Sequence, residues 1–281
     1  MKPYAHKVKV AKDILTSLNS VVVALSGGVD SSLLLSLATQ TLGPQKVLAV
    51  TGKGSLISEN DLNYAQAVVK QVRAAYRQID FNPLDLPEFA LNKPNRCYLC
   101  RKKLYGELEL IRVEKGFAAI VDGTIADDAE DYRPGNQAAE EFNVHRPLAK
   151  AKLIKEEVRS ISRDLGLLSA ERPASPCLAT RFPYYEEITL GGLQKVSRAE
   201  TALHDQGFPI VRVRHHDGGR LARIEVPAEE IFRLNEEPAR SIITEALRNL
   251  GYLYVCVDLL GFRSGSLNDV LVETLKKKTC K

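Results

Sequence analysis

An unbroken apolar run that ends in a glycine- and serine-rich turn constrains the fold of this chain most strongly. Residues 21–25 are all apolar, which is typical of a strand buried on both faces of a parallel sheet. The turn at 26–32 reads Ser-Gly-Gly-Val-Asp-Ser-Ser, and the four leucines within 33–37 form the apolar side of the segment that follows. The stretch therefore predicts a strand, a phosphate-binding loop and a helix in immediate succession.

The turn has the chemistry of an anion site. Its glycines allow backbone conformations closed to other residues, so consecutive N–H groups can point at one phosphate beside a positive helix N-terminus. Asp30 is placed to hold a magnesium ion or the far end of a nucleotide. An ordinary turn is the alternative, but the complete pattern resembles the PP-loop of ATP pyrophosphatases, which cleave ATP between the α- and β-phosphates. The resemblance implies that ATP and Mg²⁺ bind at Ser26, Gly27, Gly28, Val29, Asp30, Ser31 and Ser32.

Strands and helices alternate over the first 170 residues, which predicts βαβ units and a parallel sheet. The expected order is helix 4–20, strand 21–25, helix 31–42, strand 46–50, helix 58–73, strand 75–81, a proline-containing loop 82–96, a helix from the Cys97 region to about 115, strand 117–121 and helix 152–167. The fold class is therefore α/β, with a parallel-sheet PP-loop domain of the adenine nucleotide alpha hydrolase type over 1–170.

A proline-containing connector at 171–183 separates this domain from a second one. The expected elements beyond it are helix 191–207, strand 209–215, strand 220–226, helix 228–250 and strand 252–260. This order predicts a smaller α+β domain over 171–281, with a hairpin turn at 215–219. The domain is also a candidate site for oligomer contacts.

Loops that leave the carboxyl ends of parallel strands lie where ligands of open α/β folds bind. Gly123 follows the strand at 117–121, so we expect it beside the nucleotide. Lys152 and Lys155 are expected in the first turn of their helix, where lysine opposes the helix dipole. A bound phosphate would compensate, and Lys155 is therefore a candidate nucleotide ligand; two solvated lysines are the alternative.

Composition narrows the class of protein and its partners. The 281 residues are 44% apolar and 26% charged, and they contain neither a long apolar run nor an apolar signal core near the start. We expect a cytoplasmic protein that does not enter membranes. A formal net charge of +4 fits an anionic small molecule better than nucleic acid, which favours a stronger basic stripe.

Cys97 and Cys100 form a CxxC pair with three possible meanings. A zinc site needs a second pair, and a redox pair should follow the first strand of a βαβ unit. With Cys177 as third ligand, three thiolates can hold a [4Fe-4S] cluster with one iron left open. We favour the cluster, with a zinc or redox site and unligated thiols as alternatives. Cys256 and Cys280 have no motif context.

Cys177 also has chemistry of its own. Arg181 follows it closely, and a nearby cation lowers the pKa of a thiol. An activated thiolate at this position can attack an adenylated carboxylate, because AMP is a good leaving group.

Four segments together resemble the LarE family of ATP-dependent sulfur transferases, and they span almost the whole chain. They are Ser26–Ser32, Asp131–Gly135, the Pro-Cys-Leu-Ala-Thr-Arg segment at 176–181 and the Val-Arg-Val-Arg segment at 211–214. The resemblance implies adenylation of a carboxylate of pyridinium-3,5-biscarboxylic acid mononucleotide and displacement of AMP by sulfur. The product is a thiocarboxylate on the way to the nickel-pincer cofactor of lactate racemase.

The same resemblance implies residue roles and partners. Cys177 would be either a sacrificial sulfur donor or a cluster ligand with Cys97 and Cys100, and the CxxC pair favours the cluster. Arg181, Arg212 and Arg214 would bind the nucleotide-like substrate, with Glu200 and Glu225 nearby. Arg212 and Arg214 share one strand face; a solvated face is the alternative. A sulfide donor, handover to a nickel insertase and a homo-oligomer, a hexamer by resemblance, are further implications.

Other functions remain open. A PP-loop enzyme that thiolates tRNA also combines CxxC with a third cysteine, although this chain lacks an evident RNA-binding appendage. An ammonia-using PP-loop synthetase would leave the cysteines unexplained. A nucleotide-binding sensor without turnover is the alternative from a different class.

Overall fold

The computed structural model describes residues 2–129, 135–173, 175–263 and 265–268. The chain divides into two compact units. The first takes in Met1–Pro83 and Asn95–Ser175, and the second takes in Leu84–Pro94 and Pro176–Lys281.

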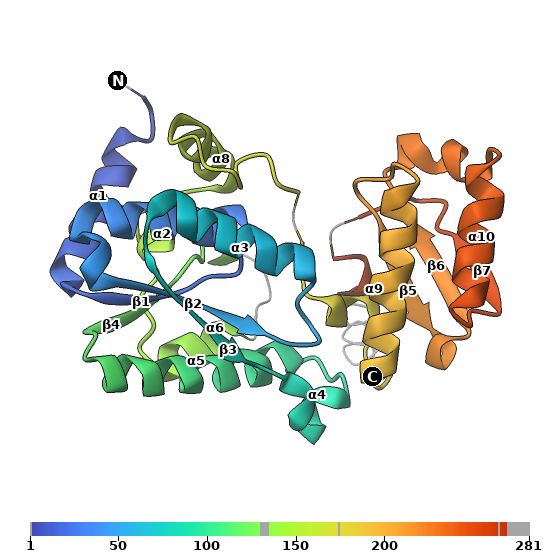
Figure 1. Cartoon of the computed structure of the whole chain (residues 1–281), viewed down its shortest axis with the longest axis horizontal. Helices are drawn as coiled ribbons and strands as arrows, with labels where there is room; N and C mark the ends of the chain where they lie inside the picture. The colour runs from blue at the N-terminus through green and yellow to red at the C-terminus, as the bar shows by residue number, and fades with distance from the viewer. Residues whose placement is uncertain (1, 130–134, 174, 264, 269–281) are drawn as a thin grey trace, which may run out of the picture. The chain divides into compact units, whose positions relative to one another are not determined.

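A four-stranded parallel sheet organises the first unit, as the sequence predicted (Figure 1). Its order is β3-β2-β1-β4, with β1 at Val21–Ala24, β2 at Val47–Lys53, β3 at Ala75–Asp80 and β4 at Ala119–Asp122. β1 is a central strand because it pairs in parallel with both β2 and β4. The phosphate loop therefore leaves the middle of the sheet at its carboxyl edge.

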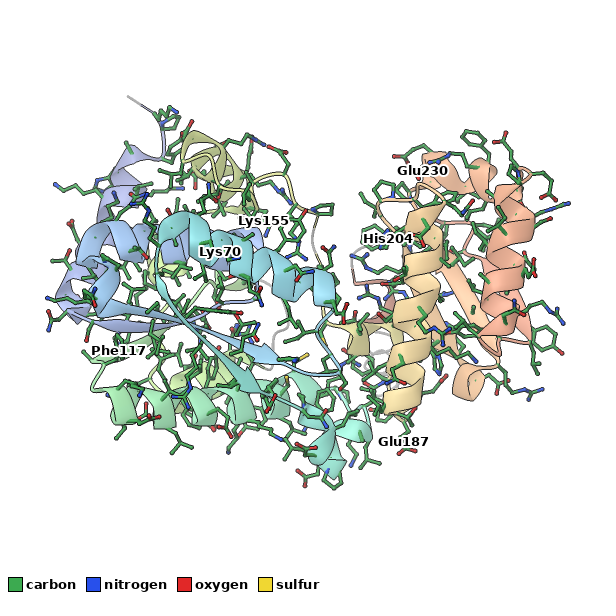
Figure 2. The ribbon with its side chains drawn as sticks, in the orientation of Figure 1. Lys70, Phe117, Lys155, Glu187, His204 and Glu230 are labelled. Carbon is green, nitrogen blue, oxygen red and sulfur yellow. The ribbon has the colours of Figure 1, made fainter. Side chains whose placement is uncertain are left out.

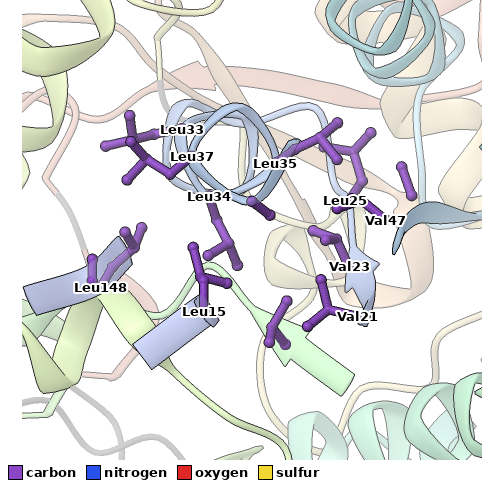
Figure 3. Close-up of a cluster of buried hydrophobic side chains, with 14 of the residues drawn as sticks. Leu15, Val21, Val23, Leu25, Leu33, Leu34, Leu35, Leu37, Val47 and Leu148 are labelled. Carbon is purple, nitrogen blue, oxygen red and sulfur yellow. The ribbon is translucent and has the colours of Figure 1, made fainter. Parts of the chain in front are cut away.

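Helices cover both faces of this sheet (Figure 1). They are α1 at Ala5–Leu18, α2 at Val29–Leu42, α3 at Glu59–Val72, α5 at Arg96–Lys115, α6 at Gly135–Glu141, α7 at Pro147–Lys150 and α8 at Lys155–Asp164. Val21 and Val23 pack into one core with the leucines of α2 (Figure 3). Val22 points to the opposite core, with Tyr105 and Leu108 of α5. A strand alternates its side chains, so the uniformly apolar run of β1 serves two cores at once.

Several boundaries in the first unit differ from the sequence-based prediction. β2 continues through Lys53, because Thr51–Lys53 pair with β3 instead of forming a loop. The predicted loop 82–96, of which Leu84–Pro94 belongs to the second unit, contains a 3-10 turn at Pro83–Asp85 and a short helix, α4, at Pro87–Ala90. The helix predicted at 152–167 begins only at Lys155, because Lys152 has a φ of +57°. Lys152 is thus outside the first turn, and its predicted place there is wrong.

The second unit is α+β, as predicted, with a three-stranded mixed sheet in the order β5-β6-β7. β5 at Arg212–His216 runs antiparallel to β6 at Leu221–Glu225, and β7 at Tyr254–Val257 runs parallel to β6. The 3-10 turn η5 at Asp217–Gly219 joins β5 to β6, which confirms the hairpin. α9 at Leu190–Asp205 and α10 at Ala239–Asn249 supply side chains to the core of this unit.

The single helix predicted over 228–250 is wrong. The chain instead forms the 3-10 segment η6 at Ala228–Asn235 and then α10, with Pro238 at the N-cap of α10. Proline lacks a backbone N–H and clashes with the preceding turn, so a continuous helix cannot pass through this position. Among the described helices, none is long and apolar enough to cross a membrane.

Candidate active site

The loop between β1 and α2 has the geometry of a phosphate cradle. Gly27 has a φ of +77°, and a Cβ at this position would lie 2.7 Å from the carbonyl oxygen of Asp61. Gly28 is the N-cap of α2 and is extended, and no side chain caps this end of the helix. The Oγ atoms of Ser26 and Ser31 lie 3.1 Å apart across the loop. Hydroxyl groups and the N-terminus of α2 therefore converge on one small region.

Two further observations fit a phosphate at this loop. Ser32 Oγ is buried and has no hydrogen-bond partner within the described part of the chain. At Gly123, a Cβ would lie 2.6 Å from the backbone nitrogen of Ser31, so only glycine lets the end of β4 approach α2 this closely. The predicted nucleotide ligands at 26–32 and Gly123 are thus brought together.

Asp30 and Lys155, both expected at the nucleotide, form an ion pair with each other. Lys155 Nζ lies 2.9 Å and 2.6 Å from the two carboxylate oxygens of Asp30. Lys155, labelled in Figure 2, is the first residue of α8, and its backbone N–H donates to Asp127 Oδ2 at 2.8 Å. Burial raises the pKa of the Asp30 carboxyl, and the ammonium group of Lys155 opposes that shift.

Sequence reasoning missed Arg172, which it treated only as part of the connector. This buried arginine donates from Nη1 to the carbonyl oxygen of Gly27 at 2.8 Å and forms an ion pair with Asp61 of α3. Its guanidinium also lies over the ring of Tyr64, 4.2 Å from the centroid. The available signal was a charged residue in a proline-containing connector. That signal does not identify Gly27 as the partner of Arg172, because Gly27 is 145 residues away in sequence.

A second missed residue is Arg101 on α5. Its Nη1 is buried without a hydrogen-bond partner among the residues that the structure describes. Gly135 makes room for it, since a Cβ there would lie 2.5 Å from Arg101 Cδ. Nearby, Tyr105 donates to Asp122 at 2.6 Å; burial opposes the charged form of Arg101, but acidic neighbours that include Asp122 outweigh it and raise the pKa of Arg101. The rest of the predicted motif, 131–134, lies outside the described residues.

The three motif cysteines belong to different units. Cys97 and Cys100 lie in the first turn of α5, and their spacing of three places them on one side of that helix; Cys97 is exposed and Cys100 is half-buried. Cys177 is exposed at the N-cap of the 3-10 turn η4, Leu178–Arg181, in the second unit. None of the three forms a disulfide. Cys256 lies on β7, and Cys280 falls outside the described residues.

No group of three or more His, Cys, Asp or Glu side chains within the described ranges is arranged to hold a metal ion. Cysteine thiolates are the usual ligands of iron–sulfur clusters, so the chemistry of these three residues fits a cluster. The cluster assignment stays a prediction.

Arg181 is almost fully buried and points away from solvent. Its Nε and Nη2 donate to the two carboxylate oxygens of Glu200 at 2.8 Å each. Nη1 donates to the carbonyl oxygens of Pro176 at 2.8 Å and Cys177 at 3.3 Å. The guanidinium therefore fixes the backbone of the Cys177 segment.

Arg212 and Arg214 lie beside this pair on β5, with 7% and 5% of each residue exposed. The alternative of a solvated strand face is therefore wrong. Arg214 Nη2 donates to Glu225 at 2.6 Å and to Ser266 at 3.0 Å. Burial, together with the positive charge of Arg181, lowers the pKa of Arg212 to about 10. The positive charges of Arg181 and Arg214 both act on Arg212, so the cluster is chemically suited to an anion.

Comparisons with known proteins agree with this architecture. The NAD synthase family model matches residues 7–97, which include the phosphate loop. A pyridinium-3,5-bisthiocarboxylic acid mononucleotide synthase from Lactiplantibacillus plantarum is 36% identical over 273 residues, 97% of this chain and 98% of that protein. An uncharacterized protein from Synechocystis is 39% identical over 95% of this chain and 98% of its own length. Another, from Methanocaldococcus jannaschii, is 31% identical over 87% and 91%.

The parallel sheet, the loop at 26–32 and the family match define an ATP-dependent enzyme of the PP-loop class. Within that class, similarity over nearly the full length of the synthase is decisive. The chain belongs to the LarE family of sulfur transferases, which confirms the resemblance found in its sequence.

Proposed function

We propose that this enzyme adenylates a carboxylate of pyridinium-3,5-biscarboxylic acid mononucleotide and replaces AMP with sulfur. The product would be a thiocarboxylate used to build the nickel-pincer cofactor of lactate racemase. Similarity to the synthase over 97% of the chain supports this substrate.

The observation that carries the proposal is the buried arginine cluster of the second unit. Arg181 and Arg214 each form an ion pair with a glutamate, and Arg212 donates from Nη1 to the carbonyl oxygen of Val211 at 2.6 Å. The positive charges of Arg181 and Arg214 act on the buried Arg212, and a phosphate monoester would offset this repulsion in the fork geometry typical of guanidinium recognition. The phosphate of a mononucleotide fits this requirement.

The first step uses the phosphate loop. A substrate carboxylate oxygen attacks the α-phosphorus of ATP, the bond to the β-phosphate breaks, and pyrophosphate leaves. The N–H groups at the start of α2 and the hydroxyls of Ser26 and Ser31 would stabilise the charge on the phosphates. Asp30 would take part in Mg²⁺ binding once the phosphates compete for Lys155.

The second step exchanges oxygen for sulfur. A sulfide nucleophile attacks the acyl carbon of the adenylate, the acyl–oxygen bond breaks, and AMP leaves. Cys97, Cys100 and Cys177 would hold a [4Fe-4S] cluster, which when bound supplies an open iron position for sulfide. Sacrifice of the Cys177 sulfur is the alternative source. In either case Arg181 would hold the backbone of the Cys177 segment in place.

The partners follow from this chemistry. A sulfide donor would recharge the enzyme, and a nickel insertase would take over the product. We also propose a cytoplasmic homo-oligomer, a hexamer by family resemblance.

The test separates the two steps in a single assay. Wild type, given ATP, Mg²⁺, sulfide and the biscarboxylate, should release pyrophosphate and form a product with the mass of an oxygen-to-sulfur exchange. In Asp30→Ala, the rate of pyrophosphate release should fall by about a hundredfold or more. Cys177→Ala should keep pyrophosphate release and lose the sulfur product. Loss of adenylation in the cysteine variant would refute this division of labour.

A further inference from the structure

Arg172 forms a hydrogen bond with the backbone of the phosphate loop. Its Nη1 donates to the carbonyl oxygen of Gly27 at 2.8 Å. That oxygen belongs to the same peptide unit as the N–H of Gly28. A trans peptide is planar, so its C=O and N–H point in opposite directions. Fixing the carbonyl on the Arg172 side therefore aims the Gly28 N–H at the other side.

The other side is the phosphate cradle. The Gly28 N–H lies 3.3 Å from Ser26 Oγ, which in turn lies 3.1 Å from Ser31 Oγ. A hydrogen bond of 3.3 Å is long, so this N–H can turn to a stronger acceptor such as a phosphate oxygen. With the peptide flipped, a carbonyl oxygen would face the phosphate instead and repel it.

The loop itself does not prevent such a flip. A flip of this peptide rotates ψ of Gly27 and φ of Gly28, and both residues are glycines, which adopt either sign of φ with little steric penalty. The restraint comes from Arg172, whose side chain is only 6% exposed. Its ion pair with Asp61 and its position over the Tyr64 ring hold the guanidinium against the loop.

We propose that Arg172 is a positioning residue for the phosphate loop, which holds the Gly27–Gly28 peptide so that its N–H faces the phosphates of ATP. Asp61 in turn positions Arg172, while its Oδ2 also accepts from the backbone N–H of Ser58 at 3.3 Å in the capping box of α3. The inference rests on the proposed use of this loop for ATP and adds a residue from the connector to the nucleotide site.

The test compares ATP with adenosine, which has the same base and ribose but no phosphate. Titration calorimetry would measure both dissociation constants for wild type, Arg172→Gln and Arg172→Lys, alongside thermal unfolding of each protein. Arg172→Gln should raise the dissociation constant for ATP by roughly tenfold to a hundredfold, as for a lost hydrogen bond from a charged donor. The value for adenosine should stay within about twofold. Arg172→Lys, which keeps the charge without the fork, should fall between.

Two more variants complete the design. Asp61→Asn keeps Gly27 and Arg172 but removes the ion pair, so it should also weaken the binding of ATP without weakening that of adenosine. This variant tests the proposal even if Arg172→Gln does not fold. Arg163→Ala is the matched control, because Arg163 pairs with Glu171, next to Arg172 in sequence, through exposed side chains. It should leave both affinities unchanged.

Each outcome decides whether Arg172 positions the phosphate loop. Selective loss of ATP affinity in a folded variant supports the positioning role. Unchanged ATP affinity, or equal losses of ATP and adenosine affinity, overturns it while leaving the proposed function intact. If wild type binds no ATP, the proposed function fails and this inference fails with it.

Discussion

His215 shows how burial fixes the charge of a single side chain. It is 5% exposed, its ring lies 4.6 Å from that of Phe182, and its Nδ1 is 3.0 Å from the hydroxyl of Tyr252. Burial lowers the pKa of His215 to about 4, and the charges of Lys195 and His216 act in the same direction. The imidazole is therefore neutral near pH 7.

This pKa makes the protein sensitive to acid. The unfolded histidine binds a proton below its ordinary pKa of 6.5, whereas the folded one excludes it down to about 4. Stability from His215 is thus complete above pH 6.5 and is lost as the pH falls toward 4, by about 3 kcal/mol in total. Urea unfolding of wild type and His215→Gln, at neutral pH and at about pH 4.5, measures this. The variant should lose less stability on acidification, and equal losses would contradict the assignment.

Among the elements, α9 and β5 depend on one buried carboxylate. Glu200 of α9 binds Arg181 through both oxygens and also accepts from the backbone N–H of Val213 on β5 at 3.0 Å. Helix, strand and the 3-10 turn that follows Cys177 are thereby tied together. Apolar packing alone would not fix their register around a buried guanidinium.

Glu200→Gln should therefore destabilise the second unit by about 3–5 kcal/mol, since it leaves a buried arginine without its counter-charge. The control is Arg240→Ala, which removes the exposed pair between Arg240 and Glu237. That pair should contribute less than about 0.5 kcal/mol. Urea titrations of both variants at neutral pH give the two values. A loss at Glu200 as small as that at Arg240 would mean that the buried pair is not needed for stability.

At the scale of the whole molecule, the proposed sulfur chemistry needs residues from both units. Cys97 and Cys100 come from α5 in the first unit, and Cys177 comes from the second. Adenylation would use the loop of the first unit, whereas the proposed phosphate site is in the second.

The iron and sulfide content of cysteine variants tests whether Cys97 is a cluster ligand. After anaerobic reconstitution, wild type should hold about four iron and four acid-labile sulfide per chain, and Cys97→Ala should hold far less. Cys256→Ala is the control, because its thiol lies on β7 near the carbonyl oxygen of Ala222 and has no role in the proposal. Equal iron in all three proteins would exclude Cys97 as a ligand. Absence of iron from wild type would make Cys177 the sulfur donor.

The sequence alone was sufficient for the architecture and for the phosphate loop. Those features are encoded by neighbouring residues: an apolar run long enough for a doubly buried strand, two glycines, and leucines at helical spacing. Local signals also placed Cys97 and Cys100 at the start of α5. Pro238 is also a local signal, since proline breaks a helix, and the predicted helix 228–250 runs through it.

Only the tertiary structure decided which charged groups meet. Lys155 and Asp30 are 125 residues apart, and Arg172 and Gly27 are 145 apart. No local pattern specifies such a pair, because it forms only after packing has brought distant segments together and removed water from between them. The same holds for the arginines of β5, whose alternation fits a solvated face equally well until α9 and the turn at Leu178–Arg181 bury them. Desolvation makes these buried charges costly, and this is the physical basis of the proposed anion site.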